Sequence, residues 1–339
     1  MTTVTAGTIA LNFDQLSVQS LLSGIVTFAS ATQISTSDSG FTDNFFGSFT
    51  YNGQGLLTGG TLTRLQETYL GQVLFDISNT SVSMATFIQW AEIDDTASAK
   101  AYILGGADSI SGSTLGDVLR AYTGADSMAG GSGNDTLDGG AGADVINGND
   151  GDDVILGGAD ANYLRGDTGN DSIVGGANFD DINGNQGDDT LRGGEGFDWV
   201  VGGQANDMLY GEGGGDIVYG NLGNDTQFGG DGEDWVRGGQ GNDSLDGGAG
   251  NDLMWGDRGD DTVAGGAGAD TFHAFVGGGL DRITDFNYAE GDRLVLDFAP
   301  PYSLRQEGAD TVVDLGGTDR VVLVNVTLSS LPAGWISLG

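Results

Sequence analysis

The chain of 339 residues carries 49 acidic against 11 basic side chains, which gives a formal net charge of −38. This charge disfavours nucleic acid and anionic lipid as direct partners. The absence of cysteine and the presence of a single histidine exclude disulfides and the usual zinc sites.

Residues 1–102 are poorer in glycine than the rest of the chain. The segments Phe46–Tyr51, Thr61–Gln66 and Gln72–Ile77 have the mixed or alternating polarity of half-buried strands. The segment Ser81–Ile93 spaces its apolar residues as a short helix does. We therefore predict a small N-terminal α+β or β-rich domain, with a capping or assembly role.

The first thirty residues do not resemble a membrane or secretory segment. Residues Met1 to Gln15 contain no lysine or arginine, whereas a secretory signal peptide begins with a basic region. The apolar stretch Leu21–Ala31 is interrupted by serine and glycine and is too short to cross a bilayer. We expect no transmembrane segment.

Nineteen nine-residue units follow one another from Ile103 to His273 without an insertion or deletion. The unit at 130–138 reads GGSGNDTLD, and the unit at 238–246 reads GGQGNDSLD. Position six is aspartate in every unit except at Asn162, and position eight is apolar in every unit except at Gln227. A disordered glycine-rich linker would not keep this phase, so the pattern predicts regular structure.

Each unit is predicted to form a six-residue turn followed by a three-residue strand. Successive side chains of a strand point to opposite faces, so position eight points inward while positions seven and nine point outward. Two units make one coil, and stacked coils give two parallel sheets. The predicted fold class is mainly β, with a parallel β-roll between the N-terminal domain and C-terminal capping strands.

The turns of this roll are predicted to bind several Ca²⁺ ions. A coil orders eighteen residues but buries only two aliphatic side chains, and such a thin core does not hold the coil closed by itself. Calcium prefers carboxylates mixed with backbone carbonyls, whereas magnesium demands stricter octahedral geometry. Aspartates two units apart, such as Asp135 and Asp153, are expected to bridge an ion between successive turns. The predicted metal ligands are the aspartates at position six: Asp108, Asp117, Asp126, Asp135, Asp144, Asp153, Asp171, Asp180, Asp189, Asp198, Asp207, Asp216, Asp225, Asp234, Asp243, Asp252, Asp261 and Asp270.

The repeat resembles the calcium-binding nonapeptide G-G-x-G-x-D-x-U-x of RTX proteins, in which U is apolar. The resemblance implies that calcium folds the roll outside the cell. It also implies export from a Gram-negative bacterium by type I secretion machinery, through an uncleaved C-terminal signal. The expected localisation is therefore secreted, in the extracellular space or on the cell surface.

The C-terminal segment is similar to the end of serralysin-type proteins. Asp281–Phe286 and Gly291–Leu296 resemble a strand pair that caps the roll in that family, and Val321–Leu328 alternates as a further strand does. The chain is thus expected to comprise an N-terminal domain at 1–102, a calcium-binding roll at 103–273, and a cap with the secretion signal region at 274–339.

One face of the predicted roll carries large apolar residues at the outward positions of four successive coils. We call it the aromatic surface, and it comprises Trp199, Val201, Ile217, Tyr219, Trp235, Leu253 and Trp255. Soluble monomers rarely leave such a surface bare. It could be covered by the N- or C-terminal part of this chain, by another protomer or protein partner, or by a carbohydrate, such as surface polysaccharide, that stacks on the tryptophans.

The sequence contains no catalytic signature that we recognise. It lacks the H-E-x-x-H motif of zinc proteases and the G-x-S-x-G motif of hydrolases. His273 ends the last repeat and is expected to be solvated, and acidic pairs such as Asp152 and Asp153 suit calcium or turns better than acid–base catalysis.

We therefore expect no enzyme, but an extracellular calcium-binding structural protein that self-assembles into a surface layer, matrix fibre or filament. One alternative is an adhesin or carbohydrate-binding module. Another is a secreted enzyme with an unrecognised catalytic domain in residues 1–102.

Overall fold

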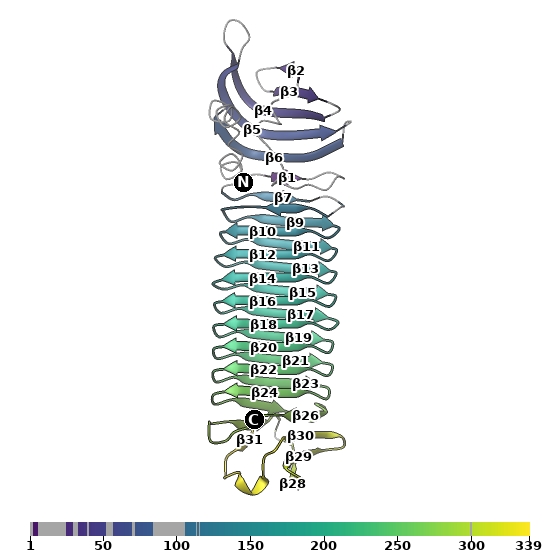
Figure 1. Cartoon of the computed structure of the whole chain (residues 1–339), viewed down its shortest axis with the longest axis vertical. Helices are drawn as coiled ribbons and strands as arrows, with labels where there is room; N and C mark the ends of the chain where they lie inside the picture. Colours follow the sequence, from purple (N-terminus) through teal and green to yellow (C-terminus); the bar gives the residue numbers. More distant parts are fainter. Residues whose placement is uncertain are drawn as a thin grey trace. The chain divides into compact units, whose positions relative to one another are not determined.

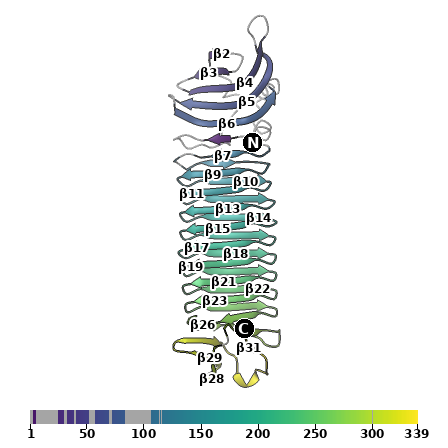
Figure 2. The same ribbon diagram turned by 180° about the vertical axis from the view of Figure 1, so that it is seen from behind.

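The computed structural model describes the backbone of six N-terminal strands, and the backbone and side chains of residues 106–339 except 113, 115 and 299. The chain divides into two compact units, Met1–Ala159 and Asp160–Gly339. Figures 1 and 2 show that parallel strands stacked one on another make up most of the second unit and the later part of the first, which begins with longer antiparallel strands. No helix in the described parts of the chain is long and apolar enough to cross a membrane.

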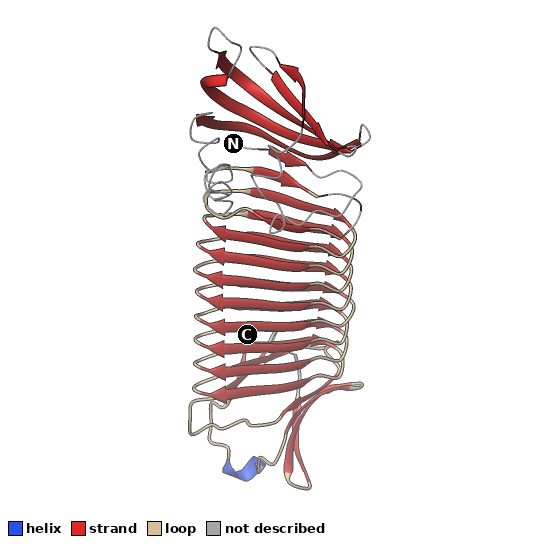
Figure 3. Ribbon diagram, turned by 45° about the horizontal axis from the view of Figure 1, so that its top comes forward, coloured by secondary structure: helices blue, strands red, loops and turns tan. Residues whose placement is uncertain are grey.

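The N-terminal strands form an antiparallel meander at the beginning of the first unit (Figure 3). These strands are β2 (Ile25–Ala29), β3 (Gln33–Asp38), β4 (Phe41–Tyr51), β5 (Leu57–Tyr69) and β6 (Gln72–Ser83). The short strand β1 (Thr3–Thr5) pairs antiparallel with β6 and parallel with β7 (Ser109–Ser111).

The three strands predicted in this region are confirmed, because they lie within β4, β5 and β6. The predicted start of a helix at Ser81 is wrong, because β6 runs on to Ser83 and pairs Val82 with Leu62 of β5. A short apolar run fits a strand as well as a helix, and pairing with β5 decides between them here. Residues 84–93 of the predicted helix lie outside the described residues.

The rest of the first unit is the beginning of a parallel β-roll. Strands β7, β9 and β11 form one sheet, and β8, β10 and β12 form the other. Paired residues lie two repeat units apart, as in Leu137 with Ile155. The strands after β7 are β8 (Val118–Arg120), β9 (Ser127–Ser132), β10 (Thr136–Ala141), β11 (Val145–Asp150) and β12 (Val154–Ala159).

The second unit repeats this arrangement over twelve repeat strands and part of a thirteenth. The odd-numbered strands are β13 (Tyr163–Thr168), β15 (Asp181–Gln186), β17 (Trp199–Gln204), β19 (Ile217–Leu222), β21 (Trp235–Gln240), β23 (Leu253–Arg258) and β25 (Thr271–Ala274). The even-numbered strands are β14 (Ser172–Ala177), β16 (Thr190–Glu195), β18 (Met208–Gly213), β20 (Thr226–Asp231), β22 (Ser244–Ala249) and β24 (Thr262–Ala267). Each set forms one parallel sheet, which confirms the predicted parallel β-roll.

Most strands of the roll are six residues long rather than the predicted three. The first three positions of each following unit continue the strand, as Gly140 and Ala141 do when they pair with Gly158 and Ala159. Position eight is buried as predicted: Leu137, for example, has no exposed surface. A single inward row of side chains from each sheet therefore makes the core.

The C-terminal strands extend both sheets of the second unit. Strand β26 (Leu280–Ile283) pairs with β24, and β27 (Arg293–Leu296) pairs with β25. The two predicted capping strands thus join different sheets and do not pair with each other. The hairpin β28 (Ser303–Glu307) and β29 (Asp310–Gly316) leads to β30 (Asp319–Leu323) beside β26, and β31 (Ile336–Leu338) lies beside β27. The strand predicted at Val321–Leu328 ends at Leu323, and a 3-10 turn, η2 (Leu328–Ser330), follows.

Candidate metal centre

The eighteen predicted aspartate ligands lie in the turns that precede the strands, and all of them are buried. None of them is more than 3 % exposed. Burying one carboxylate without a partner is costly, so a column of them requires an explanation.

The aspartates of each edge are linked in a ladder. The backbone N–H of Asp135 donates to Oδ1 of Asp153 at 2.8 Å, and the N–H of Asp189 donates in the same way to Oδ1 of Asp207 at 2.9 Å. Aspartates two units apart are therefore neighbours, as predicted, but this contact joins a backbone donor to one carboxylate oxygen. In Asp207 this contact leaves the second oxygen, Oδ2, without a hydrogen bond from the described residues.

In most of these residues the second oxygen, Oδ2, is buried and accepts no hydrogen bond from the described residues. Burial raises the pKa of Asp207 to about 8 and that of Asp243 to about 7. The hydrogen bond from the N–H of the aspartate two units earlier lowers each pKa, and the negative charges of the neighbouring aspartates raise it. The column therefore favours a proton or a cation beside each carboxylate. These buried oxygens belong to Asp126, Asp135, Asp189, Asp198, Asp207, Asp216, Asp225, Asp234, Asp243 and Asp252.

A glycine at position one leaves a space beside each of these oxygens except that of Asp126, whose unit begins with Ala121. A Cβ atom on Gly193 would lie 2.6 Å from Oδ2 of Asp198 and 2.8 Å from the carbonyl oxygen of Gly211. On the other edge, a Cβ on Gly238 would lie 2.4 Å from Oδ2 of Asp243 and 2.5 Å from the carbonyl oxygen of Gly256. A carboxylate oxygen of one turn and a carbonyl oxygen of the next thus border the same space.

This set of donors fits calcium. Within residues 106–339, no cluster of three or more histidine, cysteine, aspartate or glutamate side chains is placed to hold a metal. Any ion between the turns must therefore take much of its coordination from backbone carbonyls. Calcium accepts six to eight oxygen ligands of mixed type in flexible geometry, so aspartates and carbonyls of successive turns suit it.

In most units position four is a glycine, and successive turns approach each other closely there. Gly214 has φ of 137°, and a Cβ atom on it would lie 1.3 Å from the carbonyl oxygen of Gly196. A side chain on Gly214 in this conformation would push the coils apart. Where position four does carry a side chain, at Asp160, Asn178 and Ala205, φ is smaller, between 68° and 80°.

Comparison with known families decides what the repeats are. The model described as "RTX calcium-binding nonapeptide repeat (4 copies)" matches residues 102–137, 129–164, 156–191, 165–200, 192–227, 228–263 and 255–283. Together these segments cover more than half of the chain. The chain belongs to this RTX family. The match ends at residue 283, so the likeness of the C-terminal segment to serralysin-type proteins stays a prediction.

Two solved structures are similar to parts of this RTX protein. Extracellular lipase LipA from Serratia marcescens is 20 % identical over 53 % of this chain and 40 % of the lipase, with a TM-score of 0.23. The AlgE6R3 subunit of the mannuronan C5-epimerase from Azotobacter vinelandii is 28 % identical over 41 % of this chain and 81 % of that subunit, with a TM-score of 0.28. The match thus spans less than half of the lipase. No curated protein matches the chain.

The sequence reasoning missed a second ladder at position five of the RTX repeats. The backbone N–H of Asn242 donates to Oδ1 of Asn224 at 2.8 Å, and the N–H of Asn224 donates to Oδ1 of Asn206 at 2.9 Å. The signal was present, because alternate units carry asparagine or aspartate at this position. On the other edge, Phe179 and Phe197 occupy position five and stack with their ring centroids 6.2 Å apart.

Both departures from the repeat pattern lie inside the second unit. Asn162 donates its backbone N–H to Oδ1 of Asp180 at 2.8 Å and its side-chain amide to the carbonyl oxygen of Asp160 at 3.0 Å. Gln227 is fully buried at position eight. Its Nε2 lies 3.5 Å from the carbonyl oxygen of Gly238, and its Oε1 has no hydrogen-bond partner among the described residues.

The structure brings the seven residues of the aromatic surface together. Strands β17, β19, β21 and β23 are neighbours, with Trp199, Ile217, Trp235 and Leu253 in one register row and Val201, Tyr219 and Trp255 in the adjacent row. Trp199 is 48 % exposed and Trp235 is 54 % exposed, so nothing described in residues 160–339 covers them. A shallow depression of about 280 Å³ adjoins the second row and is lined by Tyr219, Arg237, Gly239, Gln240, Asp257, Arg258 and Phe275.

His273 is less solvated than predicted. Its ring stacks on Trp255 with the centroids 4.2 Å apart, and its Nδ1 lies 3.0 Å from Oδ1 of Asp297. The imidazole is thus held on both sides at the end of the aromatic surface, because the outward position nine of β25 lies next to Trp255 of β23.

Proposed function

We propose that this protein is a secreted, non-enzymatic structural protein whose RTX roll folds on calcium and whose copies join through the aromatic surface. The assembled form would be a surface layer, a matrix fibre or a filament. The observation that carries the proposal is the buried column of aspartate Oδ2 atoms, most of which lie beside a space that a backbone carbonyl oxygen also borders. Calcium supplies the positive charge that this column needs.

Calcium dependence suits export by a type I system of a Gram-negative bacterium. Residues 103–273 hold 32 of the 49 acidic side chains and five arginines, so without cations this part of the chain repels itself. Such a chain stays unfolded where calcium is scarce. It folds where calcium approaches the range of extracellular calcium modules, which bind at about 10⁻⁴–10⁻³ M.

Self-association is supported by the exposed aromatic residues on a regular sheet. Trp199 and Trp235 lie two strands apart, roughly 10 Å, in one row. Phe197, also exposed, precedes Trp199 in the adjoining turn and stacks on Phe179. Large aromatic side chains contribute most of the binding energy at protein interfaces, so burying this surface against a second copy would stabilise an assembly.

A second candidate function is carbohydrate binding, as in an adhesin. The depression beside the aromatic surface favours it, because Arg237, Gln240 and Arg258 offer hydrogen-bond donors next to the Tyr219 ring. Sites that combine an aromatic platform with a few polar groups suit sugars. Surface polysaccharide is the partner that this candidate implies.

Light scattering and sedimentation of the whole chain, with chelator and with about 1 mM calcium, test the proposal. We expect association only with calcium. The double variant Trp199→Ser/Trp235→Ser should stay monomeric, whereas Met208→Ser, which removes an exposed side chain from the other sheet, should associate like the original chain. A folded chain that remains monomeric at every concentration contradicts assembly. Glycan binding that disappears in the double variant would instead support the second candidate.

A further inference from the structure

Arg258, the last residue of β23, is an exposed positive charge in a strongly acidic chain. The other four arginines of the RTX repeats each form an ion pair with an acidic side chain: Arg120 with Asp138, Arg165 with Asp181, Arg192 with Glu212 and Arg237 with Asp257. The guanidinium of Arg258 makes no ion pair and no hydrogen bond with the described residues of 160–339. It is therefore available to an acidic group from another molecule.

The aromatic surface differs in charge between the two ends of its strands. Strands β17, β19, β21 and β23 end at Gln204, Leu222, Gln240 and Arg258, and Asp260 follows in the next turn. We call this side the exit end. The turns that lead into the same strands, which we call the entry end, carry the exposed acidic residues Glu195, Asp231 and Glu233. Since both ends also carry position-six aspartates, the entry end is the more negative of the two.

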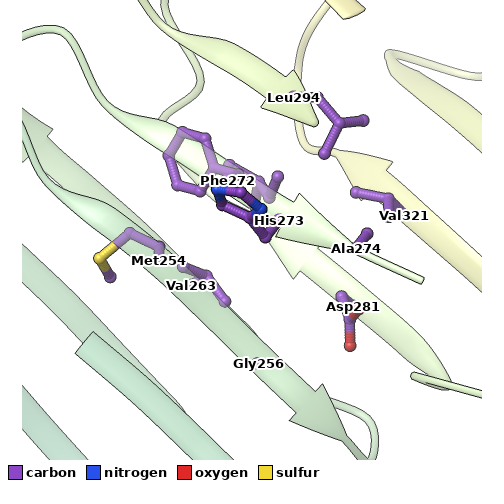
Figure 4. Close-up of a pocket in the computed structure, with 10 residues that line it drawn as sticks. Met254, Gly256, Val263, Phe272, His273, Ala274, Asp281, Leu294 and Val321 are labelled. Atoms are coloured by element: carbon purple, nitrogen blue, oxygen red, sulfur yellow. The ribbon is translucent and has the colours of Figure 1, made fainter. Parts of the chain in front are cut away.

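The depression of about 280 Å³ lies toward the exit end. Besides Arg258, it is lined by the rings of Tyr219 and Phe275 and by Gly239, a buried residue without a side chain. Its volume lies just below the range of about 300–1,000 Å³ that is typical of pockets for whole small molecules, which suits one large side chain. By contrast, the cavity in Figure 4 lies among buried apolar side chains such as Phe272 and measures about 10 Å³, the space of about one water molecule.

Trp235 is the most exposed side chain of the aromatic surface. It is 54 % exposed and begins β21, next to the entry end. Gly239 of the depression lies further along the same strand, toward the exit end. A second copy that faces this surface with its strands reversed therefore places each Trp235 over the depression of the other copy. A tryptophan seated in a fitted depression is a typical anchor of a protein interface.

The charges of the two ends select between two ways of docking. Two copies that meet face to face are related by a two-fold axis in the plane of contact, either along the strands or along the roll. An axis along the strands brings the two entry ends together, so that Glu195, Asp231 and Glu233 of both copies lie on the same side of the contact. Such like-charge contacts weaken binding. An axis along the roll reverses the strands, sets the entry end of one copy against the exit end of the other, and leaves the two rolls parallel.

We propose that a second copy docks on the aromatic surface with its roll parallel to the first. Trp235 of each copy then enters the depression of the other, and Glu233 of each copy pairs with Arg258 of the other. This inference rests on the proposed self-assembly and names the contacts that orient the two copies. The pair is the unit from which the layer, fibre or filament is built.

The association constant of full-length variants, measured by sedimentation at saturating calcium, tests this pairing. Arg258→Glu and Glu233→Arg each place like charges at both symmetric contacts, and we expect each to weaken association roughly tenfold or more. An equimolar mixture of the two variants sets opposite charges together at both contacts and should recover nearly the original constant. Arg282→Glu is the matched control, because it reverses an exposed arginine on β26 of the other sheet, and it should leave the constant unchanged.

Introduced thiols report the orientation, since the chain contains no cysteine. On mild oxidation, Glu233→Cys mixed with Arg258→Cys should give a mixed disulfide, whereas Glu233→Cys alone should give none. Circular dichroism shows whether each variant is folded. Should a charge variant fail to fold, the thiol pair decides.

Three results overturn the inference: unchanged association of folded Arg258→Glu, a mixture of charge variants that does not recover, and a disulfide formed by Glu233→Cys alone. The proposed assembly fails with a different result, because the folded, unaltered chain then stays monomeric. That result leaves the depression to a carbohydrate.

Discussion

Replacing Gln227 by leucine should stabilise the roll. Gln227 is fully buried at an inward position, between Leu209 and Leu245 in the register of its sheet. Its Nε2 makes one contact of 3.5 Å with the carbonyl oxygen of Gly238, which is long for a hydrogen bond. Its Oε1 has no partner in residues 106–339. The amide therefore loses its hydration on folding and regains little.

The size of the effect follows from this unsatisfied amide. A buried acceptor without a hydrogen bond costs about 1–3 kcal/mol, and leucine, which is similar in size, removes that cost while burying apolar surface. The free energy of unfolding should thus rise by about 1–3 kcal/mol. For a domain of this size, that corresponds to an increase in melting temperature on the order of 5 °C.

Thermal melting of Gln227→Leu at saturating calcium, followed by circular dichroism, measures this change. Leu209→Gln is the reverse control, because it places the same amide one coil earlier, and its melting temperature should fall. A Gln227→Leu variant that melts at the original temperature or below refutes the reasoning. The amide would then make a stabilising interaction that outweighs its desolvation, such as coordination of an ion.

Three further predictions concern the turns. Asp207→Asn should shift the calcium midpoint of folding upward, since one site contributes about 1.4 kcal/mol when calcium stands tenfold above its dissociation constant; a calcium titration followed by circular dichroism shows the shift. Burial raises the pKa of Asp207 to about 8 and of Asp243 to about 7, against about 3.9 in an unfolded chain. The metal-free roll therefore binds more protons than the unfolded chain between about pH 4 and 8 and loses stability as pH rises through that window. Calcium affinity should correspondingly weaken as pH falls, which titrations at about pH 5.5 and 7.5 compare. Gly214→Ala should open the coil locally, because its Cβ would meet the carbonyl oxygen of Gly196, and hydrogen exchange at the neighbouring amides should then accelerate.

The period of the sequence was enough to predict the roll and the place of its aspartates. Alternation along a strand sets position eight inward, and an exact nine-residue phase places residues eighteen apart on neighbouring strands, as Asp135 and Asp153 show. The same spacing predicted that Trp199 and Trp235 lie in one row of their sheet.

Other features depend on contacts that the period does not contain. The six-residue strands arise because backbone pairing continues into the first positions of the next unit, although glycine favours a turn there. The sequence did not predict the position of Asp281, because two inserted residues break the nine-residue phase. In the structure its Oδ1 nevertheless accepts the N–H of Asp261, as in the aspartate ladder of the repeats. The predicted helix start at Ser81 failed because pairing with β5 outweighed a local apolar spacing.

Far-UV circular dichroism of the whole chain, recorded in calcium, after addition of a chelator and again after calcium is restored, tests the central claim most directly. The buried aspartate column predicts that the β signal and the cooperative melting transition disappear with the chelator and return with calcium. A spectrum and melting temperature that stay the same after chelation would contradict calcium-dependent folding.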